Sequence, residues 1–405
     1  MIPTKTQNKN VLFLQHDSVF ESYGGVQYYI DDFLSFLSNL YGPNSLKVLL
    51  AQRGDSFQMG HRPYSIETIK LSQGLLRKLE NRFSPRFFIR SLKIARELKP
   101  SVIIASHLSL APMAAILSRL TATPFLVIAY GFEVWGNFQP QDKWALKKAD
   151  GIISISDWTK TILEKQGFNP HKISIVHPSL SPDMASLNVT TQSRNRTSLN
   201  HSTIKLLTLA RLDSSEQYKG HDHVLKALKQ INETQSHLSF SYTIQGNGDD
   251  LPRLKQLTHE YGLEKIVTFL PAVNNREDLK ATYQSHDIFI MPSRFGYWNK
   301  KWKGEGFGIV YVEAALFGVP SIAYRCGGVT DIIENQSNGL LVEPDNIEAL
   351  AEAIVGLSQD KERLIELGRR ARETALEKFT PSKIQREIEK AFNSYPFLKS
   401  EPNLS

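Results

Sequence analysis

The chain has 405 residues, of which 41% are hydrophobic and 22% are charged, and its formal net charge is +7. This length exceeds one ordinary hydrophobic core and predicts two domains. The single cysteine, Cys326, excludes an internal disulfide and a cysteine-based metal site. No apolar run reaches the ~18 residues of a membrane span, and no apolar signal segment follows Met1, so we expect a cytoplasmic protein.

The first half alternates short apolar strands with helices, which predicts a parallel, doubly wound sheet. The expected strands are residues 11–14, 47–51, 102–105, 125–129, 151–155 and 173–176. Ligands bind such sheets at the carboxyl ends of the strands. The residues at these ends are His107, Tyr130 with Gly131, Ser154, and Gly24 with Gly25 before a helix over 26–40. Taken alone, His107 fits a hydrogen-bonded core histidine slightly better than a ligand-binding one.

Residues 74–98 predict a helix that is interrupted near Pro85 and is strongly basic. Between 77 and 99, eight lysines and arginines stand against two glutamates, with leucines and phenylalanines between them. The pattern fits an amphipathic helix packed on its domain or, equally well, a surface that binds anionic lipid. A nucleic-acid surface fits less well, and we expect no nucleic-acid partner.

Residues 180–203 are rich in Ser, Thr and Asn without periodicity, which is typical of a linker. A second alternation follows, with expected strands at 204–210, 240–245, 266–269, 288–291, 321–323 and 339–342. The sequence therefore predicts an α/β fold with two doubly wound, Rossmann-like domains facing each other across a cleft. We assign them to residues 1–198 and 199–379, and we expect residues 380–405 to form a helix and tail that cross back to the first domain.

Residues 304–315 place two carboxylates, Glu305 and Glu313, on either side of a Gly-x-Gly turn that opens an apolar helix. Glycines before a helix let backbone amides point outward, and the helix N-terminus attracts anions such as phosphate. An ionised carboxylate instead suits hydroxyls, because it accepts from several at once. Either glutamate alone fits a solvated surface residue, but the pair with its glycines favours a sugar nucleotide as ligand.

With these motifs the chain resembles the retaining glycosyltransferases of family 4, which have the GT-B fold. Five signals carry the resemblance: Arg211 followed by Lys219 and Gly220, the Gly246–Gly248 turn, the Glu305–Glu313 spacing, the Gly-Gly loop at 327–331, and Gly24 with Gly25. One position departs from the pattern. Many members have a histidine where this chain has Tyr130, which can donate a hydrogen bond but carries no proton charge near neutral pH. His107 is the candidate to take the role of that histidine.

The resemblance implies transfer of a hexose, with retention, from a GDP- or UDP-sugar to a saccharide or lipid-linked acceptor in polysaccharide or glycoconjugate biosynthesis. The implied catalytic residues are Arg211, Lys219 and Glu305. The implied donor-binding residues are Gly24, Gly25, Gly246, Gly248, Gly306, Phe307, Gly308, Ile309 and Glu313. The residues expected near the acceptor are His107, Tyr130, Gly131 and Glu133. Glu305 is then a sugar-positioning group, which favours front-face substitution.

We expect no metal and no cofactor, because no Asp-x-Asp motif stands out and the cations Arg211 and Lys219 can stabilise a leaving diphosphate by several kcal/mol. Residues 295–303 hold aromatics and lysines just before Glu305 and suggest a lid or an acceptor contact. The alternatives are a sucrose-type or sugar-phosphate synthase, a sugar-nucleotide epimerase, and a non-catalytic sugar-nucleotide-binding subunit.

Overall fold

The computed structural model describes residues 9–16, 25–52, 62, 64–71, 84–136, 138–181, 184, 203–235, 237–273, 275–298 and 300–399. The chain forms two compact units. Unit 1 comprises Met1–Ser179 and Ser382–Ser405, and unit 2 comprises Leu180–Pro381. The division falls at the start of the segment expected to be a linker, most of which lies outside the described residues.

Unit 1 is built on a seven-stranded sheet in the order β3-β2-β1-β4-β5-β6-β7, with all neighbours parallel. Its strands are β1 (Val11–His16), β2 (Leu46–Gln52), β3 (Ser65–Lys70), β4 (Val102–Ala105), β5 (Phe125–Ala129), β6 (Gly151–Ser154) and β7 (Ile173–Ile175). The central strands are buried apolar runs, as expected of a parallel sheet with helices on both faces. Strand β3 was not predicted, because this edge strand is half-exposed and largely polar.

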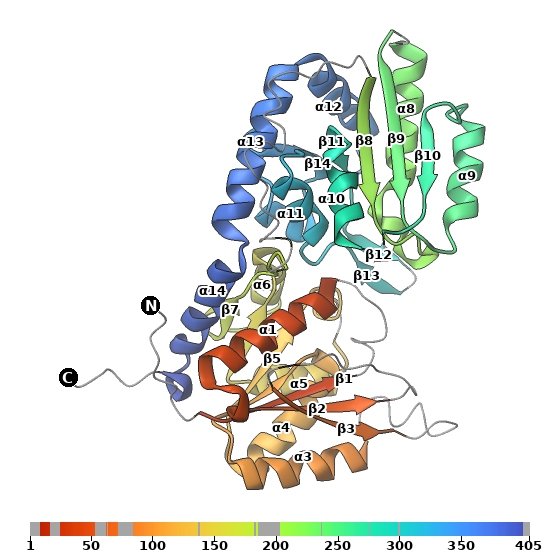
Figure 1. The fold of residues 1–405 in the computed structure, drawn as a ribbon. Helices are drawn as coiled ribbons and strands as arrows, with labels where there is room; N and C mark the ends of the chain where they lie inside the picture. The colour runs from red at the N-terminus through yellow and green to blue at the C-terminus, as the bar shows by residue number, and fades with distance from the viewer. Residues whose placement is uncertain are drawn as a thin grey trace, which may run out of the picture. The chain divides into compact units, whose positions relative to one another are not determined.

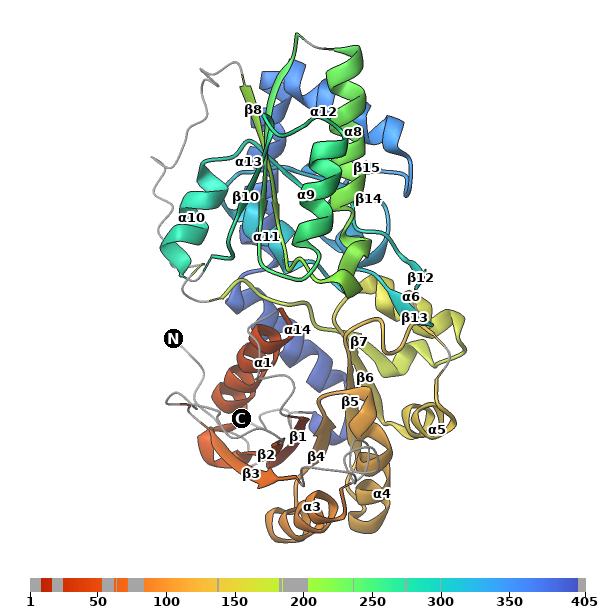
Figure 2. The same cartoon turned by 90° about the vertical axis from the view of Figure 1, so that its right-hand side faces the viewer.

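Figures 1 and 2 show α1 and α14 on one face of this sheet and α3, α4 and α5 on the other. The helices are α1 (Gly25–Tyr41), α3 (Pro85–Leu98), α4 (Ala111–Thr121), α5 (Pro140–Lys148), α6 (Asp157–Lys165) and α14 (Pro381–Ser394), with short 3₁₀ turns η2 (Pro43–Ser45), η3 (Leu108–Leu110), η4 (Pro170–Lys172) and η7 (Pro396–Leu398). Phe392 of α14 packs against Phe33 and Tyr41 of α1, with ring centroids 6.1 and 6.2 Å away. The last helix therefore belongs to the first domain, as predicted.

The basic segment is described from Ser84 onward. The side chain of Ser84 caps α3, and Pro85 is its first residue, so the expected interruption is the start of the helix. Residues 72–83 lie outside the described residues. In α3, Phe87 and Ile94 are buried against the unit, and Arg90 binds Glu67 of β3, whereas Ile89 is 65% exposed. The helix thus has the packed apolar face of the first interpretation.

Unit 2 is built on a six-stranded parallel sheet in the order β10-β9-β8-β11-β14-β15. Its strands are β8 (Thr203–Leu209), β9 (Ser239–Gln245), β10 (Val267–Leu270), β11 (Ile288–Ile290), β14 (Ser321–Tyr324) and β15 (Gly339–Val342). Its helices are α8 (His221–Thr234), α9 (Leu251–Glu260), α10 (Arg276–Gln284), α11 (Ile309–Leu316), α12 (Ile347–Gln359) and α13 (Lys361–Lys378), with 3₁₀ turns η5 (Ser214–Lys219) and η6 (Gly327–Asp331). Figure 2 shows α8 and α9 on one face of the sheet and α10, α11 and α13 on the other.

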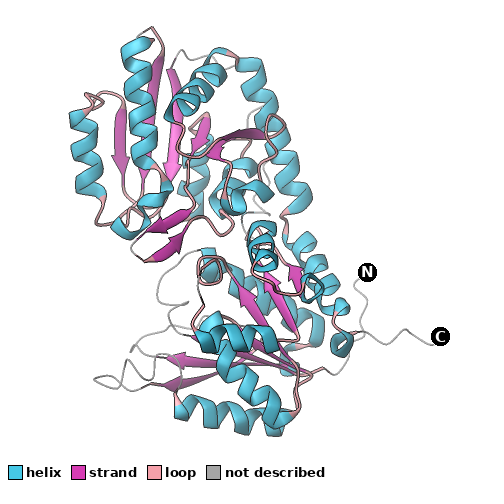
Figure 3. Cartoon of the chain, turned by 180° about the vertical axis from the view of Figure 1, so that it is seen from behind, coloured by secondary structure: helices cyan, strands magenta, loops and turns pink. Residues whose placement is uncertain are grey.

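Two further strands, β12 (Gly296–Trp298) and β13 (Lys301–Lys303), form an antiparallel hairpin just before Glu305. The sequence indicated only a loop here, because three-residue strands leave too few positions for an alternating pattern. Figure 3 shows the sheets of both units between layers of helices, which is the predicted doubly wound architecture. Among the residues that the structure describes, no helix combines the length and the apolarity that crossing a bilayer requires.

Candidate active site

The loop that carries Glu305 is held in place by glycines. Gly308 caps α11 with φ +96°, in the left-handed region, and a Cβ there would lie 2.6 Å from the ring of Tyr311. The backbone amide of Gly328 in η6 donates to the carbonyl oxygen of Glu305 over 2.8 Å. The first turn of α11 therefore begins beside Glu305, and its amides have no acceptor within the helix. This is the arrangement that favours an anion.

Glu305 presents an unused hydrogen-bond acceptor. Its Oε2 atom is buried and has no hydrogen-bond partner among the residues that the structure describes. Burial raises the pKa of Glu305, the positive charges of Lys219 and Arg211 lower it, and the carboxylate of Glu216 raises it. A buried carboxylate oxygen without a partner is costly, so a ligand that donates hydrogen bonds here is stabilised.

The two predicted cations share one carboxylate. Lys219 Nζ lies 2.7 Å from Glu216 Oε2, and Arg211 binds Glu216 Oε1. The side chain of Lys219 is 11% exposed, whereas that of Arg211 is 64% exposed. Sequence reasoning missed Glu216, although its place three residues before Lys219 in a helical turn brings the two side chains to one side. The structure thus brings Arg211, Lys219 and Glu305 together, with Glu216 among them.

The predicted glycines at 246 and 248 lie under the segment that carries Arg211. A Cβ at Gly246 would lie 1.8 Å from the carbonyl oxygen of Ala210, and one at Gly248 would lie 1.9 Å from that of Leu212. These contacts leave no room for a side chain. The close packing of this turn against Ala210 and Leu212 therefore positions the loop that carries Arg211 next to the end of β8. The remaining predicted donor residues follow at α11, where Gly306 precedes the helix, buried Phe307 packs on Phe379, and Ile309 is the first helical residue.

Glu313 is bound by a residue that sequence reasoning missed. The hydroxyl of Tyr283, on α10, donates to Glu313 Oε2 over 3.0 Å. Tyr283 is fully buried, and its ring stacks on Phe317 with centroids 5.7 Å apart. Burial raises the pKa of Glu313 to about 7, although the Tyr283 hydrogen bond and the charge of Arg276 lower it. Tyr283 carried no sequence signal, because it lies thirty residues away on another helix.

The residues expected near the acceptor gather at the ends of β4 and β5 in unit 1. His107 stacks on Tyr130, with ring centroids 6.3 Å apart and planes at 22°. Glu133 Oε1 accepts from the backbone amide of Tyr130 over 2.5 Å. Tyr130 Oη and Glu133 Oε2 are buried without a hydrogen-bond partner among the described residues. Gly131 leaves the space that the ring of Trp135 fills.

Other predicted positions in unit 1 have different outcomes. Gly25 is the first residue of α1, and Gly24 lies outside the described residues. The hydroxyl of Ser154 donates to the carbonyl oxygen of Ser156 over 2.8 Å, so it stabilises the turn between β6 and α6.

Comparisons with known proteins identify the family. A family model described as "Glycosyl transferases group 1" matches residues 189–374, and one described as "Glycosyltransferase Family 4" matches residues 23–183. The chain is a family 4-like glycosyltransferase with the GT-B fold. It is 25% identical over 321 residues to an uncharacterized glycosyltransferase of Haemophilus influenzae, covering 77% of this chain and 83% of that protein.

This glycosyltransferase is also 32% identical over 155 residues to a GDP-mannose-dependent alpha-(1-6)-phosphatidylinositol monomannoside mannosyltransferase of Mycobacterium tuberculosis. That match covers 38% of the chain and 39% of the relative's length. Among solved structures, Anabaena HepE in complex with UDP and glucose aligns with a TM-score of 0.69 at 20% identity, over 95% of this chain and all of that one. This likeness confirms the fold.

The hairpin of the glycosyltransferase presents aromatic side chains. Phe295 stacks on Trp302 with centroids 5.0 Å apart, and Tyr297 meets Trp302 edge-on at 5.7 Å. On the other side, the guanidinium of Arg294 lies 5.7 Å from the ring centroid of Trp298. Tyr297 is 61% exposed and Trp298 is 36% exposed. The hairpin therefore presents aromatic side chains shortly before Glu305 in the chain.

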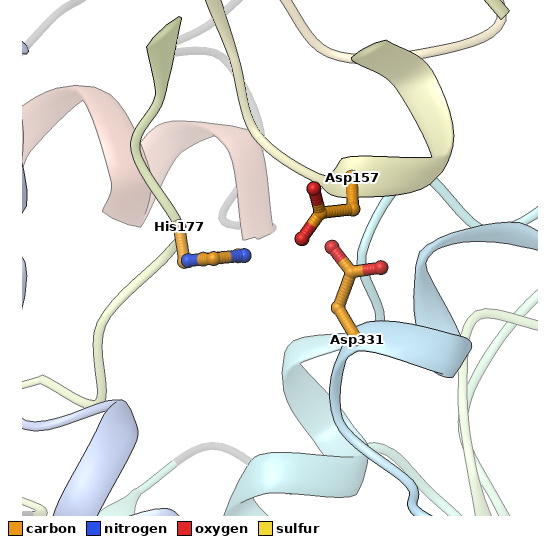
Figure 4. Close-up of side chains that lie close together, drawn as sticks. All are labelled: Asp157, His177 and Asp331. Carbon is orange, nitrogen blue, oxygen red and sulfur yellow. The ribbon is translucent and has the colours of Figure 1, made fainter. Parts of the chain in front are cut away.

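Within each unit taken by itself, the described residues bring no three His, Cys, Asp or Glu side chains together at ligand distance. In unit 1, Asp157 at the start of α6 and His177 after β7 come within 4.8 Å of each other (Figure 4). Asp331, also drawn there, belongs to η6 of unit 2. Glu387 of α14 accepts from the backbone amide of His177 over 2.9 Å and lies 3.0 Å from its Nδ1. His177 therefore anchors the last helix.

Proposed function

We propose that this glycosyltransferase moves a hexose from a GDP- or UDP-sugar to a saccharide or lipid-linked acceptor, with retention and without a metal, in polysaccharide or glycoconjugate biosynthesis. The observation that carries the proposal is the convergence of Arg211 and Lys219 on one carboxylate beside Glu305, whose Oε2 atom is buried. The mannosyltransferase relative is GDP-mannose-dependent by name, and HepE was solved with UDP and glucose. Both donors therefore stay in the proposal.

The diphosphate of the donor is assigned to the two cations and to the amides at the start of α11. Negative charge builds on the leaving diphosphate as the glycosidic bond breaks. Lys219 and Arg211 supply fixed positive charge, and the amides of Phe307, Gly308 and Ile309 supply hydrogen-bond donors. These groups can do for the leaving diphosphate what a divalent metal does in other sites.

The two glutamates are assigned to the sugars of the donor. Glu305 accepts hydrogen bonds from hydroxyls of the hexose, for which its unpartnered Oε2 is available. Glu313, held by Tyr283, accepts from the ribose hydroxyls. Because Glu305 binds hydroxyls, the reaction needs no covalent glycosyl intermediate on it. The acceptor oxygen attacks from the face that the diphosphate leaves, the old C–O bond to phosphate breaks, and the acceptor's proton passes to the leaving phosphate oxygen.

The acceptor is assigned to the ends of β4 and β5 in unit 1, where His107, Tyr130, Gly131 and Glu133 lie. The aromatic hairpin of unit 2 is a second proposed contact for saccharide, because aromatic faces stack on sugar rings. A lipid-linked acceptor would bring the enzyme to the inner face of the membrane. Ile89 and the cations around it on α3 are the proposed contact with anionic lipid.

The first test is a thermal-shift and turnover panel of UDP-, GDP- and ADP-sugars in the presence of EDTA. We expect one nucleotide to stabilise the protein and its sugar to be hydrolysed slowly without metal. An Arg211→Ala variant should keep its fold and lose turnover, since Arg211 is mostly exposed. Stabilisation without turnover would favour the non-catalytic binding subunit. Release of nucleotide only after metal is added would overturn the metal-independent mechanism.

A further inference from the structure

We infer that His107 acts as a hydrogen-bond donor through its Nε2–H to an oxygen of the acceptor, and that Ser109 and His16 position it for this role. The inference rests on the proposed function, in which unit 1 binds the acceptor. It defines the chemical role of His107, which the sequence placed near the acceptor only as a candidate replacement for the histidine that many family members have at the position of Tyr130.

The backbone fixes which nitrogen of His107 carries the proton. The amide of Ser109 donates to His107 Nδ1 over 3.1 Å. The hydrogen of a backbone amide cannot rotate away, so Nδ1 must offer its lone pair and the neutral ring carries its proton on Nε2. A proton on Nδ1 would point at the amide hydrogen of Ser109.

The hydroxyl of Ser109 extends this arrangement to a second histidine. Ser109 Oγ lies 2.9 Å from His107 Nδ1 and 2.9 Å from His16 Nε2. The Ser109 hydroxyl can also donate to Nδ1, sharing its single lone pair with the amide, and its oxygen can then accept from His16 Nε2–H. His16, at the end of β1, and Ser109, in η3, are positioning residues that hold the ring of His107 from its Nδ1 side.

The consequence is chemical. A general base must accept a proton at the nitrogen that faces the substrate, but here that nitrogen already carries one. His107 can donate to an acceptor oxygen and cannot take its proton without turning against Ser109. This agrees with a reaction in which the leaving diphosphate takes the proton.

The surroundings fit a ligand rich in oxygen atoms. The ring of Tyr130 stacks on His107, and Tyr130 Oη is buried without a hydrogen-bond partner among the described residues. Ser106 Oγ, directly after β4, is likewise buried without a hydrogen-bond partner among the described residues. Hydroxyl groups left without partners at the carboxyl ends of two adjacent strands favour a polyhydroxylic ligand, which is the class of a saccharide acceptor.

The direct test is the tautomer of His107. Long-range ¹H–¹⁵N correlation spectra of the full chain with ¹⁵N-labelled histidine identify which ring nitrogen is protonated, and the signals absent from His107→Gln assign the residue. We expect a protonated Nε2 and an unprotonated Nδ1 at pH 7. A proton on Nδ1, or on both nitrogens, would overturn the inference. Ser109→Ala keeps the backbone amide and should keep the tautomer.

A second test separates a donor from a base by activity. The reaction is hydrolysis of the donor sugar found in the panel, in which water replaces the acceptor. A glutamine amide can donate near the position of Nε2 but cannot act as a base, so His107→Gln should stay within about threefold of the parent rate. His107→Leu should lose about tenfold or more. Equal losses in both variants would contradict the donor role. If no donor sugar is hydrolysed, the proposed function fails and the spectra still decide the tautomer.

Discussion

The hydroxyl of Tyr283 donates a hydrogen bond to the Glu313 carboxylate over 3.0 Å. This bond joins α10 to the helix that starts at the candidate phosphate site. The carboxylate that it holds has a pKa of about 7, because burial raises it from its ordinary value. Glu313 therefore titrates near neutral pH. Two predictions depend on this titration.

Nucleotide affinity should fall as the pH falls below about 7. In the proposed donor site the ionised Glu313 carboxylate would accept hydrogen bonds from the ribose hydroxyls, whereas its protonated form loses acceptor capacity. Isothermal titration of UDP or GDP between pH 5.5 and 8.5 checks this. Glu313→Gln should bind more weakly at pH 8 and lose the pH dependence. An unchanged dependence in this variant would assign the titration to another group.

Without ligand, Glu313→Gln should stabilise the protein at pH 8 and change little at pH 4.5. The carboxyl ionises at its ordinary pKa of 4.5 in the unfolded chain, but in the folded protein its pKa is about 7. Its cost to stability therefore appears as the pH rises above 4.5 and is complete above 7, at roughly 3 kcal/mol. Chemical denaturation at the two pH values measures it. Equal effects at both would show that the carboxyl has the same pKa in the folded and unfolded chain.

Glu305→Gln should lower turnover by roughly 10²-fold or more while leaving nucleotide affinity within a few fold. The neutral amide accepts more weakly than a carboxylate and keeps the size of the side chain, so the loss falls on the sugar hydroxyls. Kinetics and nucleotide binding on the same preparation separate the two effects. Glu352→Gln, on the exposed surface of α12, is the matched control. Near-full turnover of the Glu305 variant would refute the assigned role.

Lys219→Ala and Arg211→Ala should both lose turnover, but only the lysine variant should lose stability. Lys219 is buried against Glu216, so its removal leaves the carboxylate without its nearer cation at a cost of roughly 1–3 kcal/mol. Arg211 is mostly exposed and contributes little to the folded state. Thermal melting and turnover assays distinguish the two outcomes. Adding Glu216→Gln to Lys219→Ala should recover part of the lost stability.

Phe392→Ala should destabilise unit 1 by about 3–5 kcal/mol. The ring is 1% exposed and packs on Phe33 and Tyr41, so its loss leaves a cavity between α14 and α1. Chemical denaturation measures the change, and Lys390→Ala on the exposed side of the same helix serves as control. A loss below about 1 kcal/mol would mean that α14 is dispensable for the stability of the unit.

The sequence by itself determined the two parallel sheets, since apolar strands alternating with helices at this spacing bury both faces of a sheet. It also determined Glu305 and Glu313 as candidates, because the glycines between them predict an anion site at a helix start, whereas Lys219 became a candidate mainly through the resemblance to family 4 glycosyltransferases. The edge strand β3 and the hairpin β12–β13 escaped prediction, because half-exposed or three-residue strands lack an apolar pattern.

Only the tertiary structure decided which further residues contact and position these candidate site residues. Tyr283 and His16 belong to no motif, and their roles arise where separate elements meet. Glu216 and Ser109 act locally, since Glu216 lies in the same 3₁₀ turn as Lys219 and Ser109 lies two residues after His107. Tyr283 reaches Glu313 across thirty residues, and His16 reaches Ser109 across ninety-three. A hydrogen bond depends on distance and angle in space, so sequence separation gives no sign of it. Likewise, the pKa of Glu313 follows from its burial, which only the packed fold creates.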